Sequence, residues 1–334
     1  MKYSVATNWD SQLIDKISQL NKNHKDKVTE LYGSLAFSIF GSARSVPGVP
    51  EISKIKFENQ VRKMKNQNIK LNYLVNSSIF PDLKIKSNHK KAFDYFSWIE
   101  SLEPEVVTVA NKKTLDFVVE NFSKIRLNLS IVMGIKSLDK INEFRKKYKN
   151  ITRITLHQSV NRDHKLLLKH VVNAHNHKSL HRVDVEILAN EICFYNCRRM
   201  REHYKHLSLL SQKGISSIKP FELWCSNIRR GNPLEFVNAP FIRPEDVSIY
   251  KKMNIDILKI AGRGEKTGFL TRSVKAYLGQ RYNGNIMMLT YPDCWPRSER
   301  PFLDNRKLDG YLEYLWKQNK VKLNRLVEPY NIKY

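Results

Sequence analysis

The chain has 334 residues, of which 41% are apolar, and its 15 Phe, 15 Tyr and 5 Trp exclude an intrinsically disordered protein. Its formal net charge of +26 indicates an anionic partner, either RNA or a small carboxylate, although basic residues spread along a chain also arise from compositional bias. Four cysteines exclude a disulfide scaffold, and the early polar residues and the absence of an apolar run of about 18–20 residues predict a cytoplasmic protein with no membrane span.

Eight short runs of β-forming residues recur along the chain and are separated by helical patterns. The predicted strands are Tyr3–Asn8, Val28–Ser34, Ile69–Asn76, Val106–Ala110, Arg126–Val132, Thr152–His157, Val183–Asn190 and Asp256–Ala261. The predicted helices are Asp10–His24, Ile52–Gln67, Lys90–Leu102, Thr114–Phe122, Leu138–Tyr148, His164–His175 and Thr267–Tyr282. An irregular stretch, Gly41-Ser42-Ala43-Arg44-Ser45-Val46-Pro47-Gly48, follows the second strand.

Eight alternating units predict a single (β/α)8 barrel of the TIM type over residues 1–334, although the periodicity also fits a doubly wound open sheet. The positions of the unusual residues favour the barrel. They follow the carboxyl ends of strands, which gather at one face of a barrel, where active sites are built. These residues are Asn8, Gly33-Ser34, Asn76, His157, Asn190 with Cys193, and Gly262-Arg263. A cysteine-bearing insertion after strand seven, residues 191–244, and a C-terminal extension from about residue 295 to 334 complete the expected domain.

The cysteines are concentrated after the seventh strand. Cys193 and Cys197 are separated by three residues, and Cys225 and Cys294 follow singly. Four thiolates can hold an iron–sulfur cluster or a structural zinc, but zinc sites usually offer two close pairs. The spacing alone leaves a cluster, a zinc site and unligated thiols open.

An ordered series of short motifs from residue 3 to about residue 290 resembles the collagenase-like peptidase family, peptidase family U-32, in its short iron–sulfur branch. The motifs are Thr7-Asn8-Trp9-Asp10, Leu31-Tyr32-Gly33-Ser34, Leu71-Asn72-Tyr73-Leu74-Val75-Asn76, Val160-Asn161-Arg162-Asp163, Asn190-Glu191-Ile192-Cys193 with Cys197, Phe241-Ile242-Arg243-Pro244-Glu245-Asp246, Leu258-Lys259-Ile260-Ala261-Gly262-Arg263, and Lys275-Ala276-Tyr277 with Tyr282-Asn283-Gly284-Asn285. Two positions differ from similar proteins: Arg198 stands where Pro is frequent, and Ala43 where Gly is frequent.

The resemblance implies a barrel and a [4Fe–4S] cluster held by Cys193, Cys197, Cys225 and Cys294. It also implies a choice of activity. The family was named for proteolysis, whereas similar proteins support oxygen-independent hydroxylation of quinone precursors or RNA bases, with prephenate as oxygen donor. Some similar proteins work as heterodimers, which leaves a non-catalytic cluster-binding subunit as a further possibility.

Seven other residues are candidates for the site. Arg243 and Arg263 can pair with substrate carboxylates, although Arg243 can instead pair with Glu245 or Asp246, and Asp246 can cap a helix. Lys259 is expected beside Arg263 inside the barrel or paired with a core acid. Arg44 is an anion-binding candidate. Asn8 and Asn76 are expected at the mouth, and His203 is expected near the cluster or on a helix surface.

No zinc-peptidase His-Glu-x-x-His motif and no Gly-x-Ser-x-Gly nucleophile elbow occurs in the chain. Peptide cleavage is therefore the minority hypothesis. The resemblance favours a cluster-dependent oxidoreductase, foremost a hydroxylase acting on an RNA base, a quinone precursor or a small metabolite. A peptidase and a cluster-binding subunit are the alternatives.

Overall fold

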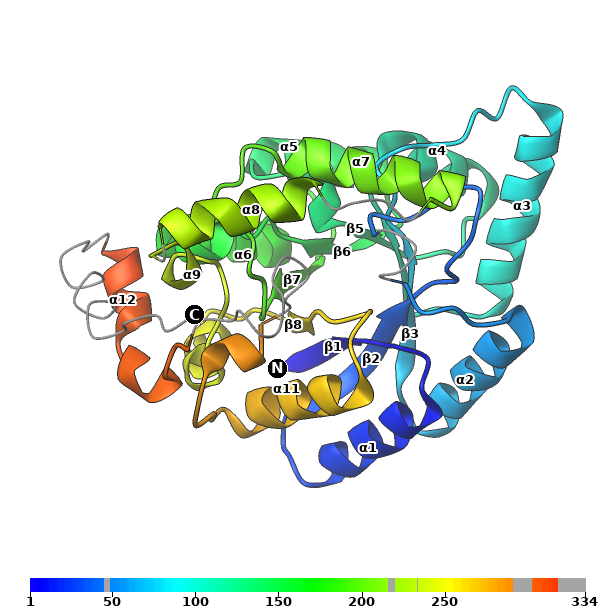
Figure 1. Cartoon of the computed structure of the whole chain (residues 1–334). Coiled ribbons are helices and arrows are strands. Elements are labelled where there is room, and N and C mark those ends of the chain that lie inside the picture. Colours follow the sequence, from blue (N-terminus) through cyan, green and yellow to red (C-terminus); the bar gives the residue numbers. More distant parts are fainter. Residues whose placement is uncertain (45–48, 216–219, 233, 291–301, 318–334) are drawn as a thin grey trace.

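Eight parallel strands close into a barrel in the order β1 to β8 in the computed structural model, which describes residues 1–44, 49–215, 220–232, 234–290 and 302–317 (Figure 1). The strands are β1 Lys2–Ala6, β2 Lys27–Gly33, β3 Lys70–Val75, β4 Val106–Val109, β5 Leu127–Leu129, β6 Ile151–Thr155, β7 Asp184–Leu188 and β8 Ile257–Ile260. Strand β1 pairs with β2 on one side, where Ala6 lies opposite Tyr32, and with β8 on the other, where Val5 lies opposite Ile260. This closure confirms the predicted (β/α)8 barrel and excludes the open sheet.

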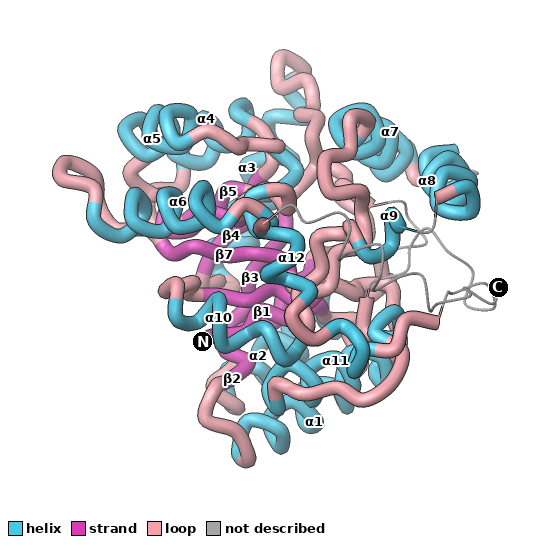
Figure 2. Tube along the Cα trace, turned by 90° about the vertical axis from the view of Figure 1, so that its left-hand side faces the viewer, coloured by secondary structure: helices cyan, strands magenta, loops and turns pink. Residues whose placement is uncertain are grey.

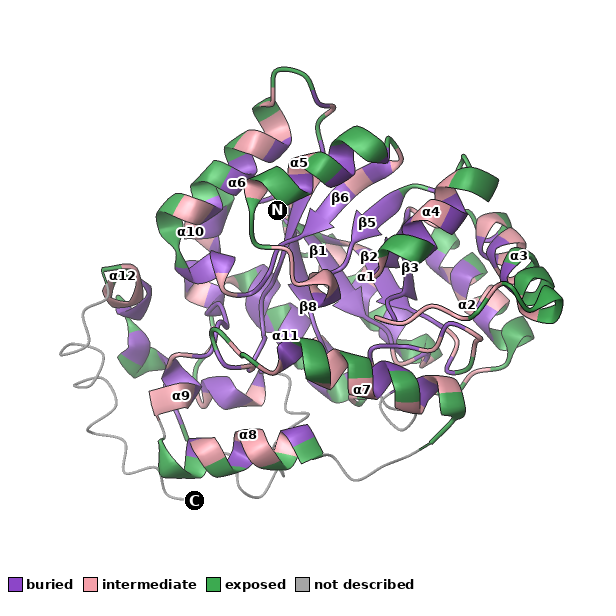
Figure 3. Ribbon diagram, turned by 90° about the horizontal axis from the view of Figure 1, so that it is seen from above, coloured by how far each residue is buried: buried purple, intermediate pink, exposed green. Residues whose placement is uncertain are grey.

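Helices surround the barrel, and their buried faces pack on the strands while the opposite faces stay exposed (Figure 3). The helices between strands are α1 Ser11–Lys22, α2 Lys54–Asn66, α3 Lys86–Ser101, α4 Lys112–Asn121, α5 Leu138–Lys147, α6 His164–Asn176 and α10 Val247–Lys252, and α11 Thr267–Gly279 follows β8. Polar side chains cap several of these helices. Asp10, Asn111 and Asp163, for example, each accept a hydrogen bond from a backbone N–H of the first turn.

Element boundaries differ little from the prediction, and the clearest difference lies at the fifth strand. Strand β5 ends at Leu129 because the Ser130 side chain accepts the N–H of Val132 and begins a 3-10 turn, η2 Ile131–Met133. Gly134, with φ +64°, then ends that turn.

The insertion between β7 and β8 is largely helical. It forms α7 Met200–Lys213, α8 Pro220–Gly231 and α9 Leu234–Val237. Loops that follow β2 and β3 are fastened to α7 by hydrogen bonds. Ser42 N–H donates to Ser211 Oγ, and Ser78 N–H donates to Ser208 Oγ, both at 2.9 Å. Helix α7 therefore lies over the carboxyl ends of these strands.

The short C-terminal elements, η7 Asn305–Leu308 and α12 Tyr311–Trp316, pack against the connection from α9 to α10 (Figure 2). We call residues 239–250 together with 302–317 the C-terminal collar. Tyr311 is its centre, since its hydroxyl donates to Phe241 O and accepts a hydrogen bond from Arg162. No helix in the described ranges combines the length and apolar character that crossing a bilayer requires.

The barrel interior contains a chain of buried charges among the apolar side chains. Arg153 lies between Glu30, at 2.6 Å, and Glu186, at 3.4 Å. Glu186 also accepts a hydrogen bond from Lys259 Nζ at 3.0 Å. Two cations and two carboxylates are thus balanced in the barrel, which offsets the cost of removing them from water.

Candidate active site at the barrel mouth

A small cavity of about 60 Å³ lies at the carboxyl ends of the strands, and we call it the mouth cavity. It is lined by Tyr32, Ala43, Arg44, Leu74, Asn76, Thr108, Ser130, Ile131, Val132, Thr155, Leu188, Glu191, Tyr204, Lys259, Ala261 and Arg263. These residues come from most of the strands, from the loop after β2 and from α7. The space admits a carboxylate or a peptide carbonyl, but not a whole metabolite.

Three cationic side chains line the mouth cavity. Lys259 is a residue of β8, donates a hydrogen bond to Glu186, and has its Nζ 4.2 Å from the centre of the Tyr32 ring. Arg263 follows the end of the same strand and donates a 3.5 Å hydrogen bond to Ser42 Oγ. Arg44 comes from the loop after β2, which also carries Ser42. The cavity therefore concentrates positive charge where an oxyanion or carboxylate can enter.

The two predicted asparagines lie in different places. Asn76 lines the mouth cavity, where its Oδ1 accepts a 3.4 Å hydrogen bond from Ser42 Oγ. Asn8 is absent from that lining. Its Nδ2 donates to Glu265 O and to Thr267 Oγ1, at 3.1 and 3.0 Å, so it ties the end of β1 to the loop after β8.

Close approach of the β2 loop to α7 depends on Gly41. A Cβ at this position would lie 2.8 Å from Gln212 Cγ and 3.1 Å from Ser208 O, and the backbone φ is +67°. Both observations require glycine. The Gln212 side-chain amide also donates to Ile39 O and Phe40 O, which fixes the loop that presents Arg44.

Glu191 and Tyr204 line the mouth cavity, although the sequence analysis assigned them no role. Glu191 directly follows Asn190, and its Oε1 accepts the N–H groups of Ile192 and Cys193 at 2.8 and 2.9 Å. Asn190 is itself buried and pairs with both the N–H and C=O of Ala261. The Glu191 carboxylate is therefore held in place beside the cations. The only sequence signal that points to Glu191 as a site residue is its position directly after the end of a predicted strand.

Tyr204, on α7, lines the cavity and lies close to the cysteine loop, by which we mean residues 189–199 between β7 and α7. Burial is the main cause that raises the Tyr204 pKa, followed by negative charge at Cys193 and Glu191, whereas Arg44 acts in the opposite direction. These groups therefore lie within electrostatic reach of one hydroxyl. Because its pKa is raised, Tyr204 is a neutral hydrogen-bond donor at physiological pH.

Cys193 and Cys197 flank this part of the mouth, and both are half-buried. The pKa of the Cys197 thiol is raised, chiefly by burial. The backbone N–H groups of Arg199 and Met200 and the charges of Arg229 and Arg199 act against that increase. Burial outweighs these groups, so the neutral thiol is favoured over the thiolate.

Cys225 lies on α8, which packs against the cysteine loop. Trp224 and Phe194 meet edge to face with ring centres 5.7 Å apart. The Arg229 guanidinium lies 4.5 Å from the Phe194 ring centre and donates to Ile192 O. Even so, within residues 1–44, 49–215, 220–232, 234–290 and 302–317 no three His, Cys, Asp or Glu side chains are arranged to hold one metal ion. Cys294, the predicted fourth ligand, lies outside the described residues.

Arg243 and His203 lie away from the mouth cavity. Arg243 is buried in the C-terminal collar, where it donates to Asn305 Oδ1, Leu308 O, Asn305 O and Asp309 Oδ1 at 2.6–2.9 Å. His203 is on α7 and faces α8, with its ring stacked on Phe221 at 4.9 Å and its Nε2 3.6 Å from Glu222 Oε1. The residues that the structure brings together are thus Arg44, Asn76, Lys259 and Arg263.

Comparisons with known proteins agree with this architecture. An uncharacterized protease of Methanocaldococcus jannaschii is 30% identical over 312 residues, which cover 91% of this chain and 87% of the relative. The solved structure of a U32 peptidase superposes with a TM-score of 0.54 at 12% identity, covering 78% of this chain and 93% of that one. The latter likeness concerns the fold alone. No family model matches the chain.

Proposed function

The chain belongs to the U32 peptidase family, and from that premise we propose that it is a hydrolase that cleaves peptide bonds at the mouth cavity. One observation carries the proposal: Arg44, Lys259 and Arg263 line the same small cavity as the Glu191 carboxylate. This arrangement places a potential base beside groups that stabilise negative charge on a carbonyl oxygen. The relative's description as a protease supports the same reaction class.

The reaction uses water as its nucleophile. Glu191 takes a proton from a water molecule as the water oxygen bonds to the peptide carbonyl carbon, and the carbonyl electron pair moves onto oxygen. Arg263, Arg44 and Lys259 stabilise that oxyanion. Glu191 then gives its proton to the peptide nitrogen as the oxyanion electron pair re-forms the carbonyl and the C–N bond breaks. The products are a carboxylic acid and an amine, and proton transfer between them gives the carboxylate and the ammonium group. The neutral hydroxyl of Tyr204 donates a hydrogen bond to the oxyanion.

The test is mass spectrometry of a peptide library incubated with the protein. We expect new peptide termini with the natural chain and none with Glu191→Gln, which keeps the shape of the side chain but removes the base. Glu202→Gln is the matched control, because Glu202 lies at the start of α7 with its side chain 66% exposed. No cleavage by the natural chain at high protein concentration would overturn the proposal.

A cluster-dependent hydroxylation is the second candidate, favoured by the position of Cys193 and Cys197 beside Tyr204 at the mouth. Cys193, Cys197, Cys225 and Cys294 would hold a [4Fe–4S] cluster, which would supply one-electron chemistry next to the bound substrate. The described cysteines alone do not form a closed donor set. Iron and sulfide content after anaerobic purification tests this candidate, and a colourless, iron-free protein removes it.

The acceptor in that case is an RNA base, a quinone precursor or a small metabolite, with prephenate as the proposed oxygen donor. The net charge of +26 supports an anionic partner in either candidate. Retention on immobilised RNA that falls steeply with salt would identify RNA as that partner. A heterodimer with a similar protein, in which this chain is a cluster-binding subunit, would appear as co-purification of the second chain.

A further inference from the structure

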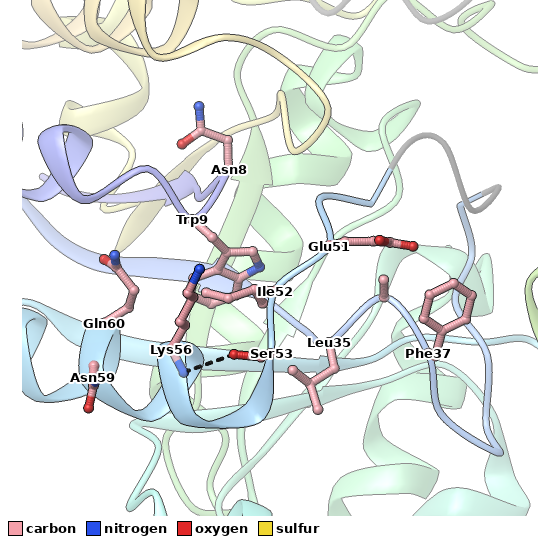
Figure 4. Close-up of a pocket in the computed structure, with 11 residues that line it drawn as sticks. Asn8, Trp9, Leu35, Phe37, Glu51, Ile52, Ser53, Lys56, Asn59 and Gln60 are labelled. Atoms are coloured by element: carbon pink, nitrogen blue, oxygen red, sulfur yellow. Dashed lines mark hydrogen bonds between the residues drawn. The ribbon is translucent and has the colours of Figure 1, made fainter.

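A second and larger hollow lies beside the mouth cavity, at the carboxyl ends of β1 and β2. It has a volume of about 750 Å³ and lies between the loop after β2 and the first turns of α2 (Figure 4). We call it the Trp9 cleft and define it by Trp9, Leu35, Phe37, Ile52, Asn59 and Gln60, with Asn8, Glu51, Ser53 and Lys56 at its edges. Ligand-binding pockets typically have volumes of about 300–1,000 Å³, so the cleft is large enough to hold part of a peptide.

The floor of the Trp9 cleft is rigid. Trp9 has a φ of 59°, which is unusual for a bulky residue, and its ring packs against Phe57 with centres 4.3 Å apart. Its indole N–H donates to Ser34 O at 3.3 Å. Gly33 makes room for this ring, since a Cβ there would lie 2.6 Å from Trp9 Cζ2. The strained backbone and the packed ring indicate a preformed surface.

The Trp9 cleft is lined by both apolar and amide side chains. Apolar side chains from Trp9, Leu35 and Ile52 form its base, and Phe37, 53% exposed, stands at one side. In the view of Figure 4 the Asn59 and Gln60 amides lie on the opposite side from Phe37. Carboxamides offer both donors and acceptors, as peptide groups do. Such a surface suits an extended peptide with a bulky apolar side chain.

The Trp9 cleft and the mouth cavity are lined by different residues, but two segments of the chain connect them. Leu35 and Phe37 on the cleft belong to the same loop as Ala43 and Arg44 in the cavity. On the other side, Asn8 at the edge of the cleft is hydrogen-bonded to Glu265 and Thr267, in the segment that follows Arg263. The cleft and the cavity therefore lie on the same face of the barrel, at the carboxyl ends of the strands.

We infer that the Trp9 cleft is the specificity subsite, which binds an extended peptide and takes a bulky apolar side chain between Phe37 and Ile52. The inference rests on the proposed function only for the neighbouring carbonyl, which would lie in the mouth cavity. Binding in the cleft requires no chemistry. Association with the peptide and its cleavage are therefore separate measurements.

The test is fluorescence anisotropy with labelled peptides that contain one Phe or, as the comparison, one Ser at the same position. Binding is measured with Glu191→Gln, so that cleavage cannot intervene. Burial of the Phe side chain is expected to give about 10- to 100-fold tighter binding than Ser. Phe37→Ala and Ile52→Asp are each expected to remove most of that preference. Equal binding of the two peptides, or a preference that both variants retain, would overturn the inference.

Two matched variants control for general loss of apolar surface. Phe302 is exposed to the same extent as Phe37, 53%, and Ile55 lies on α2, 72% exposed and outside the cleft lining. Phe302→Ala and Ile55→Asp are expected to keep the preference. Circular dichroism of all four variants confirms that each one folds, and Phe37→Ala carries the test if Ile52→Asp does not.

The outcomes also separate the inference from the proposed function. Cleavage by the natural chain with side-chain preferences that Phe37→Ala and Ile52→Asp leave unchanged would overturn the inference while the hydrolase proposal stands. Preferential binding of the Phe peptide through the cleft, without any cleavage, would support the inference while removing the hydrolase proposal.

Discussion

Arg243 and Arg263 are two buried arginines, yet they belong to regions with opposite characters. Arg243 lies in the C-terminal collar, where four hydrogen bonds to residues 305–309 bind its guanidinium to the chain. Arg263 lies at the mouth, where it lines a cavity together with Arg44 and Lys259. The type of residue and its burial are the same, and its surroundings decide between a structural and a chemical role.

This difference shows how buried charge is divided in the molecule. The collar directs Arg243 toward carboxylates and carbonyl oxygens of the chain itself, with Asp309 at 2.6 Å. The mouth brings three cations to the wall of a space that a substrate group can enter. Removal of a collar arginine should therefore lower stability first, and removal of a mouth arginine should lower activity first.

The largest expected effect is the loss of stability in Arg243→Ala. The change leaves buried carbonyl and carboxylate oxygens without their donor, so the free energy of unfolding should fall by about 3–5 kcal/mol. Urea denaturation measures this loss. Arg281→Ala is the control, because Arg281 is exposed and its removal should change stability by less than about 0.5 kcal/mol. An unchanged unfolding midpoint with weakened substrate binding would reverse the assignment of the two arginines.

Arg263→Ala should show the opposite pattern. Loss of one oxyanion-stabilising group is expected to lower kcat/KM for a cleaved peptide by about 10²–10³-fold. The decrease in unfolding free energy should be smaller than that of Arg243→Ala, measured in the same urea series. Arg263→Lys should restore part of the activity, because charge is retained but the paired N–H groups are lost. Full activity in Arg263→Ala would place the chemistry elsewhere.

The barrel could be predicted from the sequence because each unit carries its own signal. Alternation of β-rich and helical periods located all eight strands, and residues after strand ends pointed to Asn76 and Arg263. Lys259 was expected within its strand, beside Arg263 or paired with a core acid. Contacts between residues that lie far apart in the sequence could not be predicted in this way. The hydrogen-bond partners of Arg243 lie 62–66 positions further along the chain, so its place in the collar has no local pattern.

The parts of the site that sequence reasoning missed come from the insertion. Tyr204 reaches the mouth cavity only because α7 lies across the strand ends, and that path depends on contacts with Ser42, Ser78 and Ile39. Asn8 was expected at the mouth for the same reason as Asn76. It does follow the end of β1, but it lies outside the lining of the mouth cavity, and its side-chain amide binds Glu265 and Thr267 at the edge of the Trp9 cleft.

The collar should also respond to pH, through Asp246. Burial raises the pKa of this carboxyl to about 6, although Arg243 and Arg162 act in the opposite direction. Because the folded pKa lies above the unfolded value, near 3.8, the contribution of Asp246 to stability is fully present below pH 4 and is lost as pH rises through 6. The loss is of the order of 3 kcal/mol, at about 1.4 kcal/mol for each unit of pKa difference.

Asp246→Asn tests this pH dependence, since an amide of the same shape does not ionise. We expect the stability of the variant relative to the natural chain to be greater at pH 7 than at pH 4.5, as measured by thermal unfolding at both pH values. Asp94→Asn is a suitable control, because Asp94 is exposed on α3, outside the collar. A difference between Asp246→Asn and the natural chain that stays constant with pH would show that Asp246 is not the group that titrates.

The smallest expected effect concerns the contact between the β2 loop and α7, two elements that line the mouth cavity. We call this contact the seam. In Gly41→Ala the new methyl group would meet Gln212 and Ser208 O, and a φ of +67° adds backbone strain. The unfolding free energy should fall by about 1–2 kcal/mol. Hydrogen exchange should rise in α7 and in the β2 loop before it rises in the barrel strands. Gly268→Ala is the matched control, because nothing lies within 4 Å of a Cβ at that helical position. A rise in exchange in the C-terminal collar instead would show that the collar and the seam unfold as one cooperative unit. The mouth and the collar would then not be independently stable regions.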